Sequence, residues 1–172
     1  MCSSDLKLEP GTGATANSTA RARGYSFGWI GFGGENFEFY CLLTTRYLTT
    51  NGHYWYKLDI DASGDPTDKA IGWRVDYDAG SRKLKGIVHN GTSLTVVDLN
   101  TSYAADVSWH LFMRFIAGDK VYWFVNGVEK GNSVNIPTAT REALCYPIAA
   151  AENGADASQN NFEVWVQGWL KF

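Results

Sequence analysis

Apolar and polar residues alternate with a period of two along much of this chain, which is the pattern of β-strands. In the stretch 108–117 (SWHLFMRFIA) one side of an extended strand is entirely apolar: Trp109, Leu111, Met113 and Phe115. The other side mixes aromatic, aliphatic and charged residues: His110, Phe112, Arg114 and Ile116. The run near the C-terminus repeats this, with Phe162, Val164 and Val166 opposite Glu163, Trp165, Gln167 and Trp169. Such strands bury one face in a core and keep the other partly solvated.

Runs of this kind follow one another from Gly24 to the C-terminus. They span 25–32, 36–45, 53–61, 70–77, 84–88, 93–98, 109–117, 120–125, 143–151 and 162–170. Pairs rich in Gly, Asn and Asp separate most of them, as in Asn51-Gly52, Asn90-Gly91 and Asn126-Gly127. Only 137–142 is a candidate for a helical turn. Short strands with turn residues between them indicate an all-β sandwich or barrel.

The chain of 172 residues predicts one domain, residues 24–172, behind a flexible N-terminal arm, residues 1–23. Residues 7–23 are small, polar and aperiodic, which is typical of a linker or an extended arm. The first six residues, MCSSDL, have two interpretations. They resemble a translated sequencing adapter, which makes 1–6 an artefact, or the mature start of a lipoprotein acylated at Cys2. Either interpretation removes them from the fold argument.

Composition narrows the function classes. The net charge is −3 and basic residues such as Arg21, Arg23, Lys83 and Lys85 are scattered, so a nucleic-acid groove is not expected. No apolar run reaches the roughly 18 residues of a membrane span. The three cysteines are Cys2, Cys41 and Cys145, and none has metal-ligand spacing. We expect Cys41 and Cys145 to be buried thiols, with a bridge between them as the alternative.

The motif Trp109-His110, followed by a hairpin and the strand Val121–Val125 ending in Asn126-Gly127, resembles the concanavalin A-like lectin/glucanase superfamily and its laminin-G-like branch. The resemblance covers about residues 24–172 and implies an antiparallel jelly-roll β-sandwich. It also implies that Trp109 fills the core. The motif specifies the fold better than the ligand.

Glucanases of this superfamily carry catalytic acids spaced so that they share one face of a strand. The nearest match here is Glu35 and Glu38. Their odd spacing places the two carboxylates on opposite faces of a strand, whereas a retaining pair stands about 5–5.5 Å apart on one side. No nucleophile motif or phosphate loop is present either. We therefore expect no catalytic residues and no enzymatic activity.

The segment 59–70 resembles a Ca²⁺-binding loop, with Asp59, Asp61 and Asp65 at the first, third and seventh positions. The twelfth position is Ala70 instead of the closing Glu. A polar turn in which Asp and Gly serve the backbone geometry explains the same residues. The sequence thus predicts no cofactor, with Ca²⁺ at these aspartates as the alternative.

Aromatic residues make up 15% of the chain, more than one core is expected to need. Sugars stack their C–H faces on such rings, and aromatic residues also anchor protein interfaces. The rings that we expect on a ligand-binding face are Trp55, Trp73, Tyr77, Trp123, Trp165 and Trp169. A large core filled by these rings is the competing interpretation.

These observations favour a non-enzymatic β-sandwich module of an extracellular or virion assembly, such as a phage tail, fibre or decoration protein. The partners are then other proteins or copies of the chain itself. A carbohydrate-binding lectin module, with glycans as partners, is the first alternative. The second is a self-polymerising filament subunit whose N-terminal arm adds a strand to the next subunit.

Overall fold

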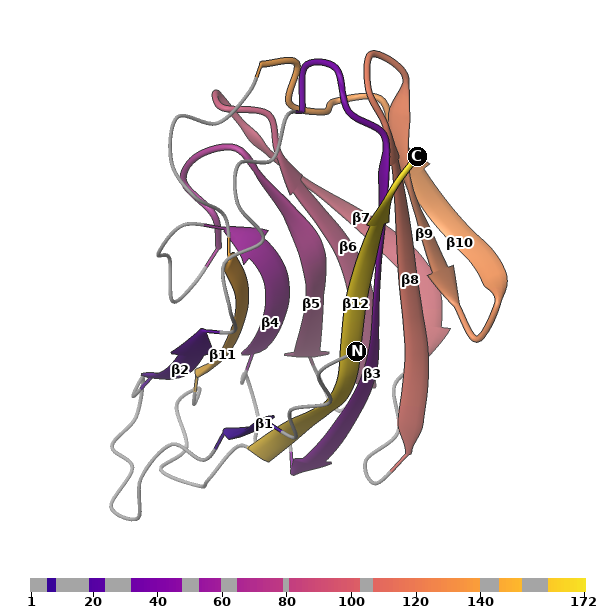
Figure 1. Ribbon diagram of the computed structural model, residues 1–172. Helices are drawn as coiled ribbons and strands as arrows, with labels where there is room; N and C mark the ends of the chain where they lie inside the picture. The colour runs from indigo at the N-terminus through magenta and orange to yellow at the C-terminus, as the bar shows by residue number, and fades with distance from the viewer. Residues whose placement is uncertain are drawn as a thin grey trace.

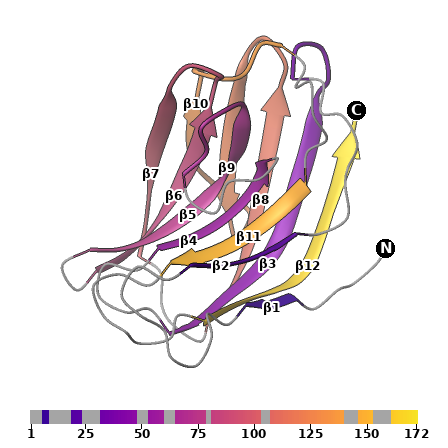
Figure 2. The same ribbon diagram turned by 90° about the vertical axis from the view of Figure 1, so that its left-hand side faces the viewer.

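Two antiparallel sheets pack face to face in the computed structural model, as the sequence predicted (Figure 1). Figure 2 looks onto the second sheet, whose strands cross those of the first at an oblique angle. The structure describes residues 6–8, 19–23, 32–47, 53–59, 65–78, 81–102, 107–139, 146–152 and 161–172. Among these residues there is no helix, and so none long and apolar enough to cross a membrane.

The first sheet has the strand order β1-β12-β3-β8-β9-β10. Its strands are β1 (Leu6–Leu8), β12 (Asn161–Lys171), β3 (Phe37–Tyr47), β8 (Ser108–Ile116), β9 (Lys120–Val125) and β10 (Val128–Ser133). The second sheet has the order β2-β11-β4-β5-β6-β7. Its strands are β2 (Thr19–Arg23), β11 (Tyr146–Glu152), β4 (His53–Asp59), β5 (Ala70–Asp78), β6 (Ser81–His89) and β7 (Leu94–Ser102).

Most predicted strands correspond to observed ones within a few residues, but three observed strands were not predicted: β1, β2 and β10. The predicted strand 25–32 lies outside the described residues except for Phe32, which is in a turn. Of the predicted helical turn 137–142, residues 137–139 are not helical and the remainder is not described.

The N-terminal arm differs from the expectation of a flexible segment. Strand β1 pairs with β12, and β2 pairs with β11, so both parts of the arm extend a sheet of their own molecule. The residues of β2, TARAR, alternate small and basic side chains. That alternation fits a sheet edge, where backbone hydrogen bonds do not require large apolar residues. The sandwich therefore begins before residue 24.

The core lies between the sheets and is rich in aromatic rings. Phe39, Tyr56 and Trp73 stack with centroid separations of 5.5–6.3 Å. The predicted core residues of β8 are confirmed for Leu111, Met113 and Phe115, which are at most 1% exposed. Trp109 is only partly buried and packs against the core without filling it. The side chains of Phe162, Val164 and Val166 lie outside the described part of the structure.

Cys41, in β3, is 2% exposed and has a free thiol, so the alternative of a bridge to Cys145 is not realised. Burial raises the pKa of this thiol well above its ordinary value. The thiol is therefore an inert, small apolar group of the core. Cys2 and Cys145 are outside the described residues.

The Trp-His and Asn-Gly parts of the motif are joined by two hydrogen bonds between His110 and Asn126. Asn126 and Gly127 have φ values of 50° and 80° and form the β9–β10 turn. The Asn126 N–H donates to the His110 carbonyl at 2.8 Å, and the His110 N–H donates to Asn126 Oδ1 at 3.0 Å. The turn residue thus fixes the end of β9 against β8, which explains why the two parts of the motif occur together.

Trp123 connects the two sheets. Its ring is fully buried and its Nε1 donates to the Gly72 carbonyl of β5 at 2.9 Å. The ring also lies directly on Gly86 of β6, where an added Cβ would stand 2.5 Å from Trp123 Cδ2. The sheets can approach at this point only because β6 has no side chain there.

We expect Gly86→Ala to destabilise the protein by about 1–3 kcal/mol, because a methyl group at this site forces the Trp123 ring or the β6 backbone to move. The matched control is Gly34→Ala, since an added Cβ at Gly34 has nothing within 4 Å. Urea denaturation followed by Trp fluorescence measures both free energies of unfolding. Equal stability of the two variants would refute the close-packing argument.

Candidate functional site

The outer face of the second sheet, turned away from the core, carries a cluster of charged side chains. On β4, β5 and β6 the core side is occupied by apolar residues: Tyr56, Leu58, Ile71, Trp73, Val75, Leu84 and Val88. The residues between them face outward: His53, Trp55, Lys57, Arg74, Asp76, Lys83, Lys85 and Ile87. We call this surface the polar face. The strand register places His53 opposite Asp76, and Trp55 opposite Arg74.

Arg74 is the centre of a continuous hydrogen-bonded network on the polar face. Its Nη1 donates to Asp65 Oδ2 at 2.7 Å, and its Nη2 donates to Asp76 Oδ2 at 3.0 Å. His53 Nδ1 is 3.0 Å from the other Asp76 oxygen, Oδ1. Trp55 Nε1 donates to Asp65 Oδ1 at 2.8 Å. These five residues connect β4, β5 and the segment that precedes β5, and we call them the Arg74 network.

The network is partly shielded from water. The side chains of Arg74 and Asp76 are 16% and 14% exposed, whereas His53 and Asp65 are 37% and 39% exposed. Burial alone would raise the pKa of Asp76, but hydrogen bonds from His53 and Arg74 outweigh it, so that pKa lies below its ordinary value. Burial likewise opposes the charge on Arg74, but the bonds to Asp76 and Asp65 raise the pKa of the guanidinium. Both groups are therefore charged at neutral pH.

Asp65, in the segment that precedes β5, accepts hydrogen bonds from both Trp55 and Arg74. Trp55 also packs with Ile87 and Leu94 in a small apolar cluster outside the main core. The Trp55 ring is only 3% exposed. Lys57, next on the outward side of β4, is fully buried. His53 and Asp65, the more exposed members, are thus the parts of the network that can touch a ligand in solution.

Half of the aromatic residues that we expected on a ligand-binding face are buried. Trp55, Trp73 and Trp123 are 3%, 1% and 0% exposed, so their rings cannot present a face to a sugar. The prediction is wrong for these three. For Trp55 and Trp123, burial of the large ring is possible because Nε1 has an acceptor, Asp65 and the Gly72 carbonyl respectively. Trp73 is buried by its stacking with Phe39 and Tyr56. The side chains of Tyr77, Trp165 and Trp169 are outside the described part of the structure.

The expected Ca²⁺ ligands are not assembled as a loop in the described residues. Asp65 is bound to Arg74 and Trp55, so its charge is already compensated. Asp59 is the last residue of β4 and its side chain is not described, and Asp61 lies outside the described residues. Within the described ranges no three His, Cys, Asp or Glu side chains gather as a metal site. Ca²⁺ binding at these aspartates stays an untested prediction.

The two acids tested for glycosidase chemistry lie on the other sheet. Glu38, in β3, pairs with Arg114 at 2.6 Å, and Glu35 precedes the strand. The residues that sequence reasoning missed are His53, Arg74 and Asp76. The sequence pattern that could have indicated them is the alternation of charged with apolar residues in 70–78 (AIGWRVDYD). This strand lies next to β4, which begins with His53.

No protein-family model matches the chain, and no curated protein matches its sequence. Its fold is similar to that of solved carbohydrate-related proteins at low identity. The carbohydrate recognition domain of Emp47p is 11% identical with a TM-score of 0.64, over 96% of this chain and 87% of that one. An alginate lyase from Alteromonas sp. 272 is 8% identical with a TM-score of 0.59, over 98% and 88% of the two chains. The alginate lyase AlyA1 from Zobellia galactanivorans is 12% identical with a TM-score of 0.56, over 98% and 77%. The chain has the concanavalin A-like sandwich fold that the Trp-His motif implied.

These similarities correct the expectation that the chain is not an enzyme. That expectation considered chiefly one reaction, glycoside hydrolysis by a carboxylate pair, and tested Glu35 and Glu38 against it. The same fold belongs to several alginate lyases. The absence of the hydrolase motif therefore does not exclude catalysis.

The Asp76 pKa has a consequence for stability. Its carboxylate stabilises the folded state fully above the unfolded carboxyl pKa of about 3.9, and this contribution is lost as the pH falls through the lower folded pKa. We expect Asp76→Asn to lower the free energy of unfolding at pH 7 and to flatten its decline below about pH 4. Denaturant titrations across this pH range provide the measurement. Asp119→Asn, at the exposed β8–β9 turn, is the control, and an equally steep decline in the Asp76 variant would contradict the assignment.

Proposed function

We propose that this chain is a glycan-processing module that binds an acidic polysaccharide on the polar face and cleaves it by elimination. The observation that carries the proposal is the hydrogen bond between His53 and Asp76, with Arg74 beside them on a sheet face. Removal of a proton next to a carboxylate needs a base and positive charge near the developing negative charge. The Arg74 network offers both types of group in one place.

His53 is the proposed base. Donation of its Nδ1–H to Asp76 leaves Nε2 as the basic nitrogen, and the Asp76 charge stabilises the imidazolium that forms when Nε2 takes a proton. In a uronic-acid polymer, Nε2 would remove the ring proton next to the carboxylate. The electron pair then forms a carbon–carbon double bond, the adjacent glycosidic C–O bond breaks, and the leaving oxygen takes up a proton.

The polar face carries one well-exposed cation that an anionic polymer could meet, Lys83 of β6. The other cations that reach its surface are paired, Arg74 with Asp65 and Asp76 and Lys85 with Asp98, while Lys57 is fully buried. Alginate is itself a polymer of uronic acids, and alginate lyases of known structure share this fold. Such polymers occur outside cells, so the proposal keeps the extracellular location that we expected. The roles in a virion or a filament stay predictions on which the described residues have no bearing.

The experiment incubates the purified chain with alginate and with other uronate polymers and follows the ultraviolet absorbance of the unsaturated product. We expect turnover by the wild type and a loss of about 10²- to 10⁴-fold in kcat for His53→Gln, which removes the base and keeps a hydrogen-bonding side chain. Lys130→Gln, on the exposed edge strand β10, is the control and should retain full activity. Folded wild-type protein that forms no unsaturated product from any of these polymers would disprove elimination.

A further inference from the structure

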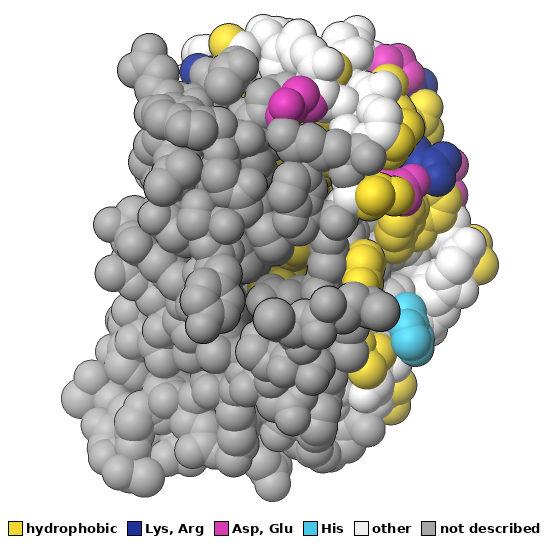
Figure 3. Space-filling view, in the orientation of Figure 1, with side chains coloured by type: hydrophobic (Ala, Val, Ile, Leu, Met, Phe, Trp, Pro, Cys, Tyr) yellow, Lys and Arg dark blue, Asp and Glu magenta, His cyan; other side chains and the backbone are white. Residues whose placement is uncertain are grey.

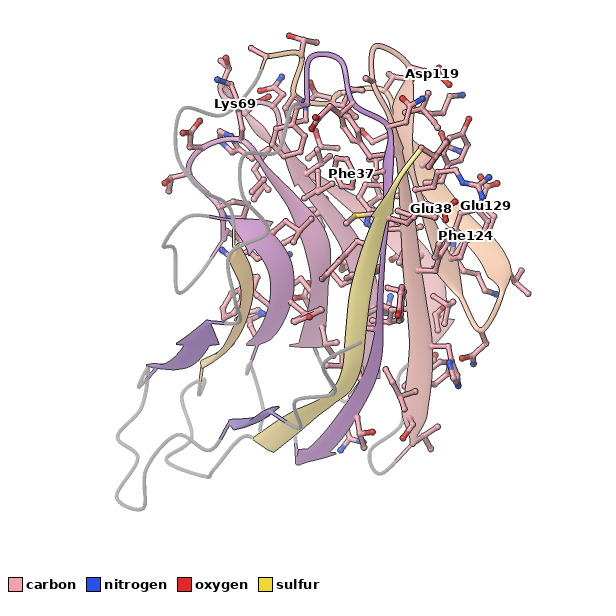
Figure 4. All side chains as sticks on the ribbon, in the orientation of Figure 1. Phe37, Glu38, Lys69, Asp119, Phe124 and Glu129 are labelled. Atoms are coloured by element: carbon pink, nitrogen blue, oxygen red, sulfur yellow. The ribbon has the colours of Figure 1, made fainter. Side chains whose placement is uncertain are left out.

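The outer face of the first sheet, on the opposite side of the sandwich, carries three aromatic residues, of which one is exposed and two are partly buried. Tyr40 of β3, Phe112 of β8 and Phe124 of β9 lie side by side in the strand register. Their chain neighbours Phe39, Leu111 and Trp123 point into the core. In Figure 4, Glu38, Phe124 and Glu129 project from this outer side while Phe37 lies between the sheets, and Figure 3 shows apolar side chains among charged ones there. Aromatic rings grouped in this way on the outer face of a sheet are a candidate interaction surface.

A pocket of about 300 Å³ opens between two cross-strand pairs on this face. Tyr40 and Phe112 form one wall, and Leu42 and His110 form the other. Gly168 of β12 lies opposite Tyr40 and adds no side chain at that position. The volume is at the small end of ligand sites, which suits about one or two sugar rings. We call this the aromatic pocket.

The walls of the aromatic pocket are held in place by their own contacts. The Phe112 and Phe124 rings meet edge to face with centroids 5.1 Å apart. The Arg114 guanidinium carbon also lies over the Phe112 ring, 5.8 Å from its centroid. A wall held by such contacts loses little conformational entropy when a ligand binds beside it. Tyr40 is the more accessible ring, with 37% of its surface exposed.

The charges around the pocket indicate a neutral ligand. Arg114 Nη2 lies 2.6 Å from Glu38 Oε1, so each compensates the other. Lys120, further along the face, lies over the Tyr122 ring at 5.6 Å. An anionic ligand would have to compete with Glu38 for the nearest cation. The walls therefore offer ring faces together with the polar atoms of His110 and the Tyr40 hydroxyl.

We propose that the aromatic pocket binds a neutral pyranose unit of a glycan. The C–H face of a pyranose stacks on the exposed Tyr40 ring with Phe112 beside it, and its hydroxyl groups hydrogen-bond to His110 and the Tyr40 hydroxyl. An apolar side chain of a protein partner would bury the same polar atoms without partners, which costs free energy. The site goes beyond the proposed function, because it lies on the other sheet and recognises uncharged sugar.

The test titrates the wild-type chain with cello-, laminari- and manno-oligosaccharides and measures Kd by calorimetry. We expect binding to at least one of them, and a Kd weaker by about tenfold or more in Tyr40→Ala. Lys130→Gln, distant from the pocket on the edge strand, should bind as the wild type does. Chemical-shift mapping on the wild type needs no variant and should show the largest changes at residues 40–42 and 110–112.

Failure to bind any neutral oligosaccharide, or shifts confined to residues elsewhere, would overturn the proposal. Concentration-dependent dimerisation that is lost in Tyr40→Ala would overturn it in favour of a second copy of the chain. Because these probes carry no uronate, the result does not depend on elimination at the polar face. Either proposal can thus fail while the other stands.

Discussion

The contact of Trp123 with Gly72 and Gly86 is the constraint on which the arrangement of both sheets depends. A single ring from β9 reaches across the core, donates to one strand and occupies the space left by the missing side chain of the next. This fixes where β5 and β6 lie relative to the first sheet. Arg74 follows Gly72 by two residues on the same strand, so its side chain points to the outer face of the sheet, away from the core. The packing inside the sandwich therefore sets the position of the Arg74 network outside it.

Strands were predictable where burial on one side imposed alternation. The bounds of β9 agree with the sequence prediction at both ends, because Val121, Trp123 and Val125 all face the core. β10 reads VEKGNS, with four exposed residues among its six, and is defined by its pairing with β9. β2 similarly depends on β11. Such strands have little apolar pattern of their own, since the hydrogen bonds of a neighbouring strand are what order them.

The Arg74 network was not predictable for a different reason. His53 and Asp76 are separated by a loop and lie opposite each other only in one register of β4 against β5. A slip of one residue would turn one of the two toward the core. The high number of aromatic residues led to a different error, since rings that are buried were predicted to lie on a ligand-binding face. Sequence alone does not reveal whether the Nε1 of a Trp has a hydrogen-bond acceptor inside the protein. Trp55 and Trp123 each have one, and both are buried.

The sandwich separates two surfaces of opposite chemistry. On the polar face, the charge of Arg74 is divided between Asp65 and Asp76, which leaves Asp76 able to hold the His53 proton. On the aromatic pocket's side, Arg114 pairs with one carboxylate, Glu38, and the pocket itself is lined mostly by apolar side chains. The aromatic core lies between them, and Lys57, although fully buried, faces outward from β4 and not into this core. Substitutions on one face are therefore expected to leave the other unchanged, since sites without shared contacts act independently.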